Sequence, residues 1–95
     1  MNFIEFPVLL DNRAALQTIY KEIGKFLVRK CTLMVGEQDA LDVVQDVFVS
    51  ALNKGQRFDS KKQLFAWFYK CCHNKCIDQL RKRRAINLSP EGWDM

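Results

Sequence analysis

Apolar residues recur at steps of three and four along positions 13–34, and this spacing constrains the fold more than any other feature. The stripe consists of Leu16, Ile19, Tyr20, Ile23, Leu27, Cys31 and Met34. Side chains three and four positions apart share one face of an α-helix, so the pattern predicts a helix with one buried side. Asp11 or Asn12 can cap its start, and Gly36 can end it in a left-handed turn.

A second helix is predicted from about Asp39 to about Lys54, where Gly55 can stop it. Its inner face is expected to contain Leu41, Val44, Phe48 and Ala51 or Leu52. The opposite face, which is expected to be exposed, carries Asp42, Gln45, Asp46 and Val49.

A third helix is predicted to start at Ser60, which has the spacing of a capping box with Gln63, and to run to about Arg84. It is either one long helix or two with a bend, and its apolar side contains Leu64, Trp67, Phe68, Cys71, Ile77 and Leu80. No stretch has the alternation of a β-strand. The predicted fold class is therefore all-α, a compact bundle of three to four helices.

The 95 residues predict one domain, residues 13–85, with an apolar arm at 1–12 and the start of a linker at 86–95. The arm is expected to pack on its own domain; docking on a partner is the alternative. Glu5 and Pro7 interrupt it and no basic segment precedes it, so it is a poor signal peptide. No segment is long enough to cross a bilayer. A soluble, cytoplasmic protein without a membrane partner is expected.

Charge is unevenly distributed along the chain. Residues 1–53 have a net charge of −2, and residues 54–95 have a net charge of +6. An acidic half beside a basic half indicates two different partners, one of them a polyanion. The alternative is a set of solvated surface charges with no binding role.

Three cysteines and the only histidine lie close together in the third predicted helix, as Cys71, Cys72, His73 and Cys76. Thiolate and imidazole are zinc ligands, and Cys31 could join them. However, neighbouring helical positions point about 100° apart and suit one ion badly. Free cysteine in a reducing cytosol commonly behaves as a small buried apolar residue, and this interpretation is favoured. No metal, cofactor or catalytic group is therefore predicted, and the chain is not expected to be an enzyme.

Basic and aromatic residues surround the same segment and suggest nucleic acid. Cations neutralise phosphates and aromatic rings stack on unpaired bases, which suits single-stranded DNA. Asn74 carries an amide that can read a base edge. A core role is the alternative for Trp67 and Phe68, and a solvated helix end is the alternative for the run from Arg81 to Arg84.

Several motifs follow one another at family-like spacing. They are DVVQDVF at 42–48, RFD at 57–59, WFYK at 67–70, Asn74, and DQLR at 78–81 with a basic end. From about residue 14 to about residue 85, this ordered set resembles region two of bacterial sigma factors, most closely the extracytoplasmic-function group. Cys71, Cys72 and His73 stand where that family usually has small aliphatic residues.

The resemblance implies that Asp42, Gln45 and Asp46 dock on the clamp coiled coil of the β′ subunit of core RNA polymerase. It also implies recognition and melting of the minus-ten promoter element, by capture of bases from the non-template strand. The implied DNA contacts are Arg57, Phe58, Asp59, Ser60, Lys70, Asn74, Lys75, Arg81, Lys82, Arg83 and Arg84. Within this set, the loop Arg57–Ser60 and Asn74 are expected to form the pocket for a flipped base.

Family members carry a second helical domain that reads the minus-thirty-five element, and this chain is expected to end inside the linker before it. The alternative function is a sigma-like interaction domain that binds polymerase or an anti-sigma factor and reads no DNA. A cysteine-based metal or redox sensor is a third possibility.

Overall fold

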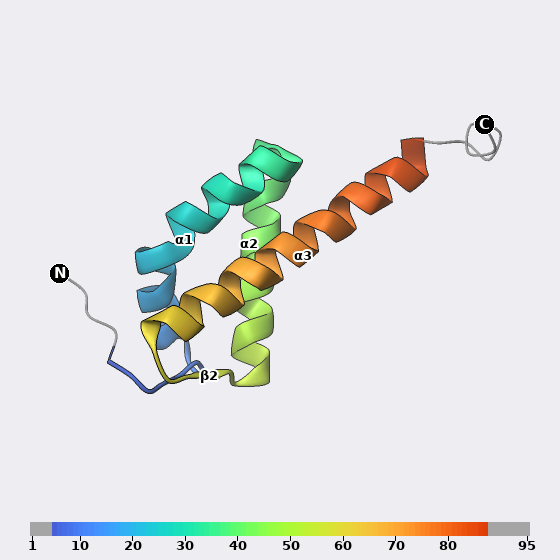
Figure 1. Ribbon diagram of the computed structural model, residues 1–95. Helices are drawn as coiled ribbons and strands as arrows, with labels where there is room; N and C mark the ends of the chain where they lie inside the picture. Colours follow the sequence, from blue (N-terminus) through green and yellow to red (C-terminus); the bar gives the residue numbers. More distant parts are fainter. Residues whose placement is uncertain (1–4, 88–95) are drawn as a thin grey trace.

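Three helices pack into a bundle and account for nearly all of the regular structure (Figure 1). This computed structural model describes residues 5–87, with side chains described as far as Arg84. The helices are α1 (Arg13–Val35), α2 (Glu37–Lys54) and α3 (Lys61–Asn87), and each of them contacts the other two. The predicted all-α class and the number of helices are confirmed, and the third helix is continuous. No described helix is long and apolar enough to cross a membrane.

The boundaries of α1 follow from local hydrogen bonds. Asn12 caps its start, because its Oδ1 accepts from the backbone N–H of Ala15 at 2.9 Å. Gly36 ends it with φ 90° and ψ 166°, a positive φ that favours glycine, although ψ is extended rather than left-handed helical. The chain reverses at this single residue, so α2 begins at Glu37, two positions earlier than predicted.

Two short strands that were not predicted join the N-terminal arm to the loop before α3. β1 (Val8–Leu9) pairs antiparallel with β2 (Arg57–Phe58). Leu10 follows β1, is fully buried, and donates its N–H to the Gln56 carbonyl oxygen at 2.8 Å. The arm therefore packs on its own domain from Phe6 to Leu10, as expected. Its first four residues lie outside the described residues, and the predicted domain boundaries stay predictions.

The Ser60 cap predicted before α3 forms, but the return bond of Gln63 reaches Asp59, one residue before the cap. Ser60 Oγ accepts from the N–H of Gln63 at 3.1 Å, and Gln63 Oε1 accepts from the N–H of Asp59 at 2.6 Å. α3 then continues to Asn87, two residues into the segment predicted as a linker. Residues 88–95 of that segment lie outside the described residues.

Seventeen described side chains form one apolar core. They are Leu10, Ile19, Ile23, Leu27, Cys31, Val35, Ala40, Val43, Val44, Val47, Phe48, Ala51, Phe58, Leu64, Phe68, Cys72 and Cys76. The stripe predicted on α1 is confirmed. The face predicted on α2 is partly wrong: Leu41 is 43% exposed, whereas Val43 and Val47 are buried. α2 packs against α1 and α3 at once, so its buried face is wider than a single stripe and is rotated away from Leu41.

Aromatic rings connect the loop to the bundle. Phe68 stacks on Phe48 with ring centroids 4.4 Å apart, and Phe58 reaches Phe68 at 5.7 Å. Phe58 also meets Trp67 edge to face at 5.6 Å. These contacts hold the loop before α3 against the bundle. The C-terminal part of α3 runs past α1 and α2 and projects from the bundle (Figure 1).

Replacing Phe58 tests whether its ring is a structural anchor. Phe58→Ala is expected to lower the free energy of unfolding by about 3–5 kcal/mol, because a buried aromatic ring leaves a cavity. Leu33→Ala is the control, since Leu33 is 84% exposed, and it is expected to change stability by less than about 0.5 kcal/mol. Urea unfolding followed by circular dichroism measures both. Equal stability of the two variants would contradict the role given to Phe58.

Candidate nucleic-acid interface

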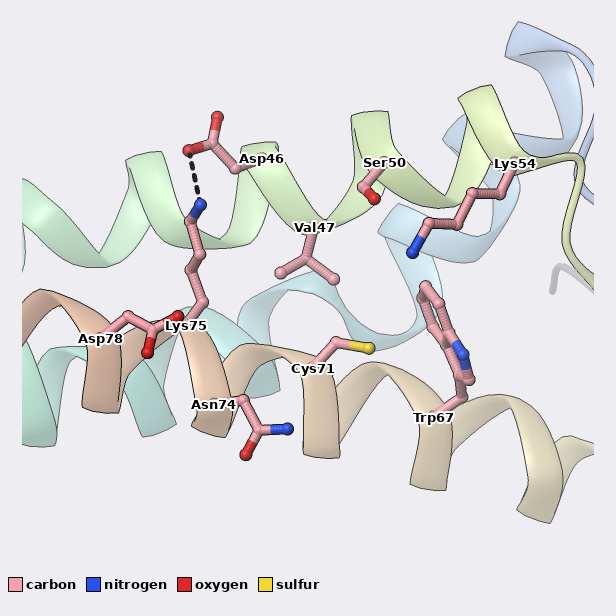
Figure 2. Close-up of a pocket in the computed structure, with 9 residues that line it drawn as sticks. All are labelled: Asp46, Val47, Ser50, Lys54, Trp67, Cys71, Asn74, Lys75 and Asp78. Atoms are coloured by element: carbon pink, nitrogen blue, oxygen red, sulfur yellow. Dashed lines mark ion pairs between the residues drawn. The ribbon is translucent and has the colours of Figure 1, made fainter.

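A groove of about 230 Å³ runs between α2 and α3 and gathers polar side chains from both (Figure 2). Its lining residues are Asp46, Val47, Ser50, Lys54, Trp67, Cys71, Asn74, Lys75 and Asp78. On each helix most members stand three or four positions apart, so they lie on one side of the helix. The groove therefore forms where these two helical faces lie side by side (Figure 2).

Asn74 and Trp67 give this groove the chemistry expected for a base. Asn74 is exposed, and in the view of Figure 2 its amide points away from α2, where it is open to solvent. Trp67 lies two helical turns earlier and is half-buried, and Figure 2 shows Lys54 directed toward its ring. The Trp67 ring and the Lys54 ammonium group thus share the groove, whereas Asn74 lines it with its amide directed to solvent.

Acidic groups also line the groove and limit its positive charge. Lys75 Nζ lies 4.0 Å from Asp46 Oδ2, an ion pair between largely exposed side chains, and Asp78 stands nearby on α3 (Figure 2). A pair of this kind contributes about 0–1 kcal/mol, so either partner can exchange it for another contact. This ion pair links Asp46, a predicted polymerase contact, to Lys75, a predicted DNA contact.

Asn74 lines the groove, whereas none of the loop residues Arg57–Ser60 is among its lining residues. That the loop and Asn74 form one pocket for a base stays a prediction. Arg57 and Asp59 are exposed and pair with each other, with Nε to Oδ1 at 3.0 Å. The loop is anchored by Phe58 to Trp67, and Trp67 in turn lines the groove that contains Asn74. Loop and groove are therefore neighbours that meet at Trp67.

Phe58 itself is 1% exposed, so its ring is not free to stack on a base. The burial of the whole residue counts against the direct DNA contact that the sequence predicted for Phe58. Ser60 is exposed, but its hydroxyl oxygen already accepts the capping hydrogen bond.

The basic end of α3 divides into exposed cations and one tethered cation. Lys70, Arg81, Lys82 and Arg84 are exposed. Arg83 instead turns back to the junction of α1 and α2, where it donates to the Val35 carbonyl oxygen at 2.6 Å and to the Asp39 carboxylate. The Val35 carbonyl lies at the negative end of the α1 dipole, which favours a cation there. Arg83 thus fastens the projecting part of α3, and its guanidinium is already engaged.

The exposed acidic face of α2 lies where the sequence predicted it. Asp42, Gln45 and Asp46 are exposed, as is Val49. Two groove residues on the same helix, Ser50 and Lys54, were not predicted as site residues. Their signal was present, because they follow Asp46 at four-residue steps.

The family model described as sigma-70 region 2 matches residues 19–86. The chain belongs to the sigma-70 region 2 family. It is 35% identical over 52 residues to the RNA polymerase sigma factor SigV of Bacillus subtilis (strain 168). That alignment covers 55% of this chain and 31% of SigV. No solved structure matches the chain significantly. The resemblance to sigma region two is therefore confirmed.

In this region 2 domain, the cysteines serve mainly as core residues, as the sequence favoured. Cys31, Cys72 and Cys76 are fully buried, and Cys71 is half-buried in the groove. Burial raises the pKa of Cys72 and of Cys76 to about 12, so both thiols stay protonated at neutral pH. Protonated thiols are poor metal ligands and poor nucleophiles. The described residues contain no group of three side chains that could hold a metal ion.

Arg83 and Arg84 form a matched pair for a test within this region 2 domain. Arg83→Gln is expected to lower the urea midpoint, because it breaks the tether to Val35 and Asp39, whereas Arg84→Gln leaves the midpoint unchanged. The Arg83 guanidinium holds the pKa of Asp39 below its usual range. The contribution of Asp39 is therefore present above the usual pKa of an aspartate, and it is lost as pH falls through the depressed value.

DNA binding is expected to distinguish the same two variants in the opposite way: here Arg84→Gln, and not Arg83→Gln, shows the effect. Arg84→Gln is expected to reduce the salt slope of single-strand binding by about 0.7, the loss of one phosphate contact. Arg83→Gln should leave that slope nearly unchanged under conditions where the variant is folded. Equal slopes and equal midpoints for the two variants would refute the tether.

Proposed function

We propose that the chain is a transcription-initiation domain that binds core RNA polymerase and captures unpaired bases of promoter DNA. The observation that carries the proposal is the groove between α2 and α3, which brings Asn74, Trp67 and Lys54 together beside an acidic α2 face. Membership of the sigma-70 region 2 family supports it. Such a domain acts where the polymerase is, in the bacterial cytoplasm.

Base capture is proposed to use the groove and the adjoining loop together. The target is the non-template strand of the minus-ten element. A base that leaves the duplex costs a few kcal/mol of stacking, and the protein offsets this through stacking and edge contacts. In the proposal Asn74 reads the base edge and the Trp67 ring supports the base. Arg57, Asp59 and Ser60 approach it from the loop.

Contacts to the DNA backbone are proposed to supply affinity that does not depend on the base sequence. The exposed cations of α3, which are Lys70, Arg81, Lys82 and Arg84, are proposed to neutralise phosphates and release counterions. Lys75 joins them when its weak pair with Asp46 opens. No covalent step is required of this chain.

Polymerase binding is proposed to use the exposed acidic face of α2. Asp42, Gln45 and Asp46 lie on consecutive turns and present two carboxylates and an amide to solvent. A basic coiled-coil surface, such as the β′ clamp, complements this face. The relative SigV is by name an RNA polymerase sigma factor, which supports the same assignment.

An alternative function is favoured by one observation. Asp46 and Asp78 offset the lysines of the groove, and Arg83 is tied to α1 and α2. In this alternative, the nearly balanced charge of the groove leaves little attraction for DNA, and the domain binds polymerase or an anti-sigma factor without reading DNA. The two proposals differ in what Asn74 does, so they are distinguished by replacing it.

Asn74→Ala tests base reading. The variant is expected to bind the preferred single-stranded oligonucleotide about tenfold more weakly, because the edge contacts of one amide are lost. Binding to a non-preferred oligonucleotide should not change. Fluorescence anisotropy at two salt concentrations measures both, with Asn53→Ala, an exposed asparagine of α2, as the control. Sequence-independent affinity that vanishes with modest salt would leave only charge attraction and reject base reading.

Asp46→Arg tests the polymerase face. We expect affinity for core RNA polymerase to fall by more than about tenfold, because a like charge is brought against a basic partner. Glu22→Arg is the matched control, since Glu22 is an exposed acid on α1 outside the proposed face. Binding of labelled protein to core polymerase measures the difference. Equal loss in both variants would reject a specific acidic face.

A further inference from the structure

A second groove, of about 380 Å³, lies between α1 and α3, outside the surfaces discussed so far. Its lining residues are Phe26, Arg29, Lys30, Leu33, Met34 and Tyr69. None of them lines the groove that contains Asn74 or belongs to the acidic face of α2. The two grooves share no lining residue.

This α1–α3 groove exposes large apolar side chains that the bundle leaves uncovered. Leu33 is 84% exposed and Phe26 is 56% exposed, the two highest values among the described large apolar residues. They stand seven positions apart on α1, which is two helical turns or about 10 Å. Exposed apolar groups that lie together mark an interaction surface more often than isolated ones do.

The charge of the groove is of one sign. Arg29 and Lys30 lie between the two apolar positions, and no acidic residue lines the groove. Lys30 is held in place, since its Nζ lies 4.5 Å from the centroid of the Tyr69 ring and 3.7 Å from Met34 Sδ. A preorganised cation beside apolar side chains favours an anionic and apolar occupant.

We propose that this groove binds an acidic amphipathic helix of a protein partner. A helix that presents apolar residues at i, i+3 or i+4, and i+7 matches the spacing of Phe26 and Leu33. Carboxylates beside those residues reach Arg29 and Lys30. The inference does not depend on DNA reading or on polymerase binding, and its test is separate from theirs.

Two other occupants fit the groove less well. A single-stranded nucleic acid needs free ring faces, but Tyr69 is covered on one side by Lys30 and Phe26 packs edge to face on Phe65 at 5.2 Å. Leu33, the most exposed of the described large apolar side chains, cannot stack on a base. A second copy of the chain would place Arg29 and Lys30 of each molecule against those of the other, which like-charge repulsion disfavours.

The probe is a synthetic helical peptide of about 16 residues, with leucines at i, i+3 and i+7 and glutamates beside them. Anisotropy of the labelled peptide is measured with the 95-residue chain and its variants. Leu33→Glu is expected to weaken binding about tenfold or more, because it removes an apolar anchor and repels the glutamates. Leu41→Glu is the control: Leu41 is exposed on α2, outside the groove. It should bind the peptide as the unaltered chain does.

A peptide with lysine in place of glutamate separates charge complementarity from simple apolar contact, and it is expected not to bind. Several results would overturn the proposal: no binding of the acidic peptide, equal binding by Leu33→Glu, or equal binding of the lysine peptide. Displacement of the acidic peptide by an oligothymidine would assign the groove to nucleic acid instead. Dimers in sedimentation that Leu33→Glu dissociates would assign it to a second copy.

Discussion

The packing of one face of α3 against both other helices is the interaction on which the rest of the structure depends. Leu64, Phe68, Cys72 and Cys76 stand four residues apart and enter the core between α1 and α2. Their burial fixes the rotation of α3 about its own axis. The residues between them then have only the outer faces left to occupy, so Trp67, Cys71 and Asn74 fall beside α2, and Tyr69 falls beside α1. Both grooves therefore result from the burial of this one face of α3.

Small thiol side chains at two of those four positions have a structural reason. Phe68 brings a large ring into contact with Phe48 and Phe58, and the next two buried positions are narrow cysteines that meet Cys31 of α1. A close-packed interior tolerates a large residue where small neighbours make room for it. The cysteine cluster that suggests a metal from the sequence alone is therefore explained by volume. The high pKa that burial gives Cys72 and Cys76 agrees with this, since a neutral thiol behaves as an apolar group.

Each feature that depends on residues within a few positions of one another could be predicted. These features are the helices, the Asn12 and Ser60 caps, and the exposed acidic face of α2. The errors arise where distant segments meet. The β1–β2 pair has two residues per strand, too few for any periodicity to register. Leu41 was assigned inside because one stripe was assumed for a helix that has two neighbours. Phe58 was assigned to DNA through the resemblance of its RFD motif to the family pattern, whereas its ring fills the core. Arg83 was grouped with its basic neighbours, since nothing local reveals that Val35 and Asp39, more than 40 positions earlier in the chain, lie beside it.

The tether at Arg83 has a mechanical consequence for the long third helix. Arg83 lies 22 residues beyond the start of α3, about 33 Å along its axis. The helix is thus secured near its origin by Phe58 and Phe68 and again near its tip by a guanidinium bound to the α1–α2 corner. A rod held at two distant points cannot swing about the first. The exposed cations near the C-terminal end of α3 therefore keep fixed distances from the loop before α3 and from Asn74. The positions of these positive charges along the helix axis are set by the fold.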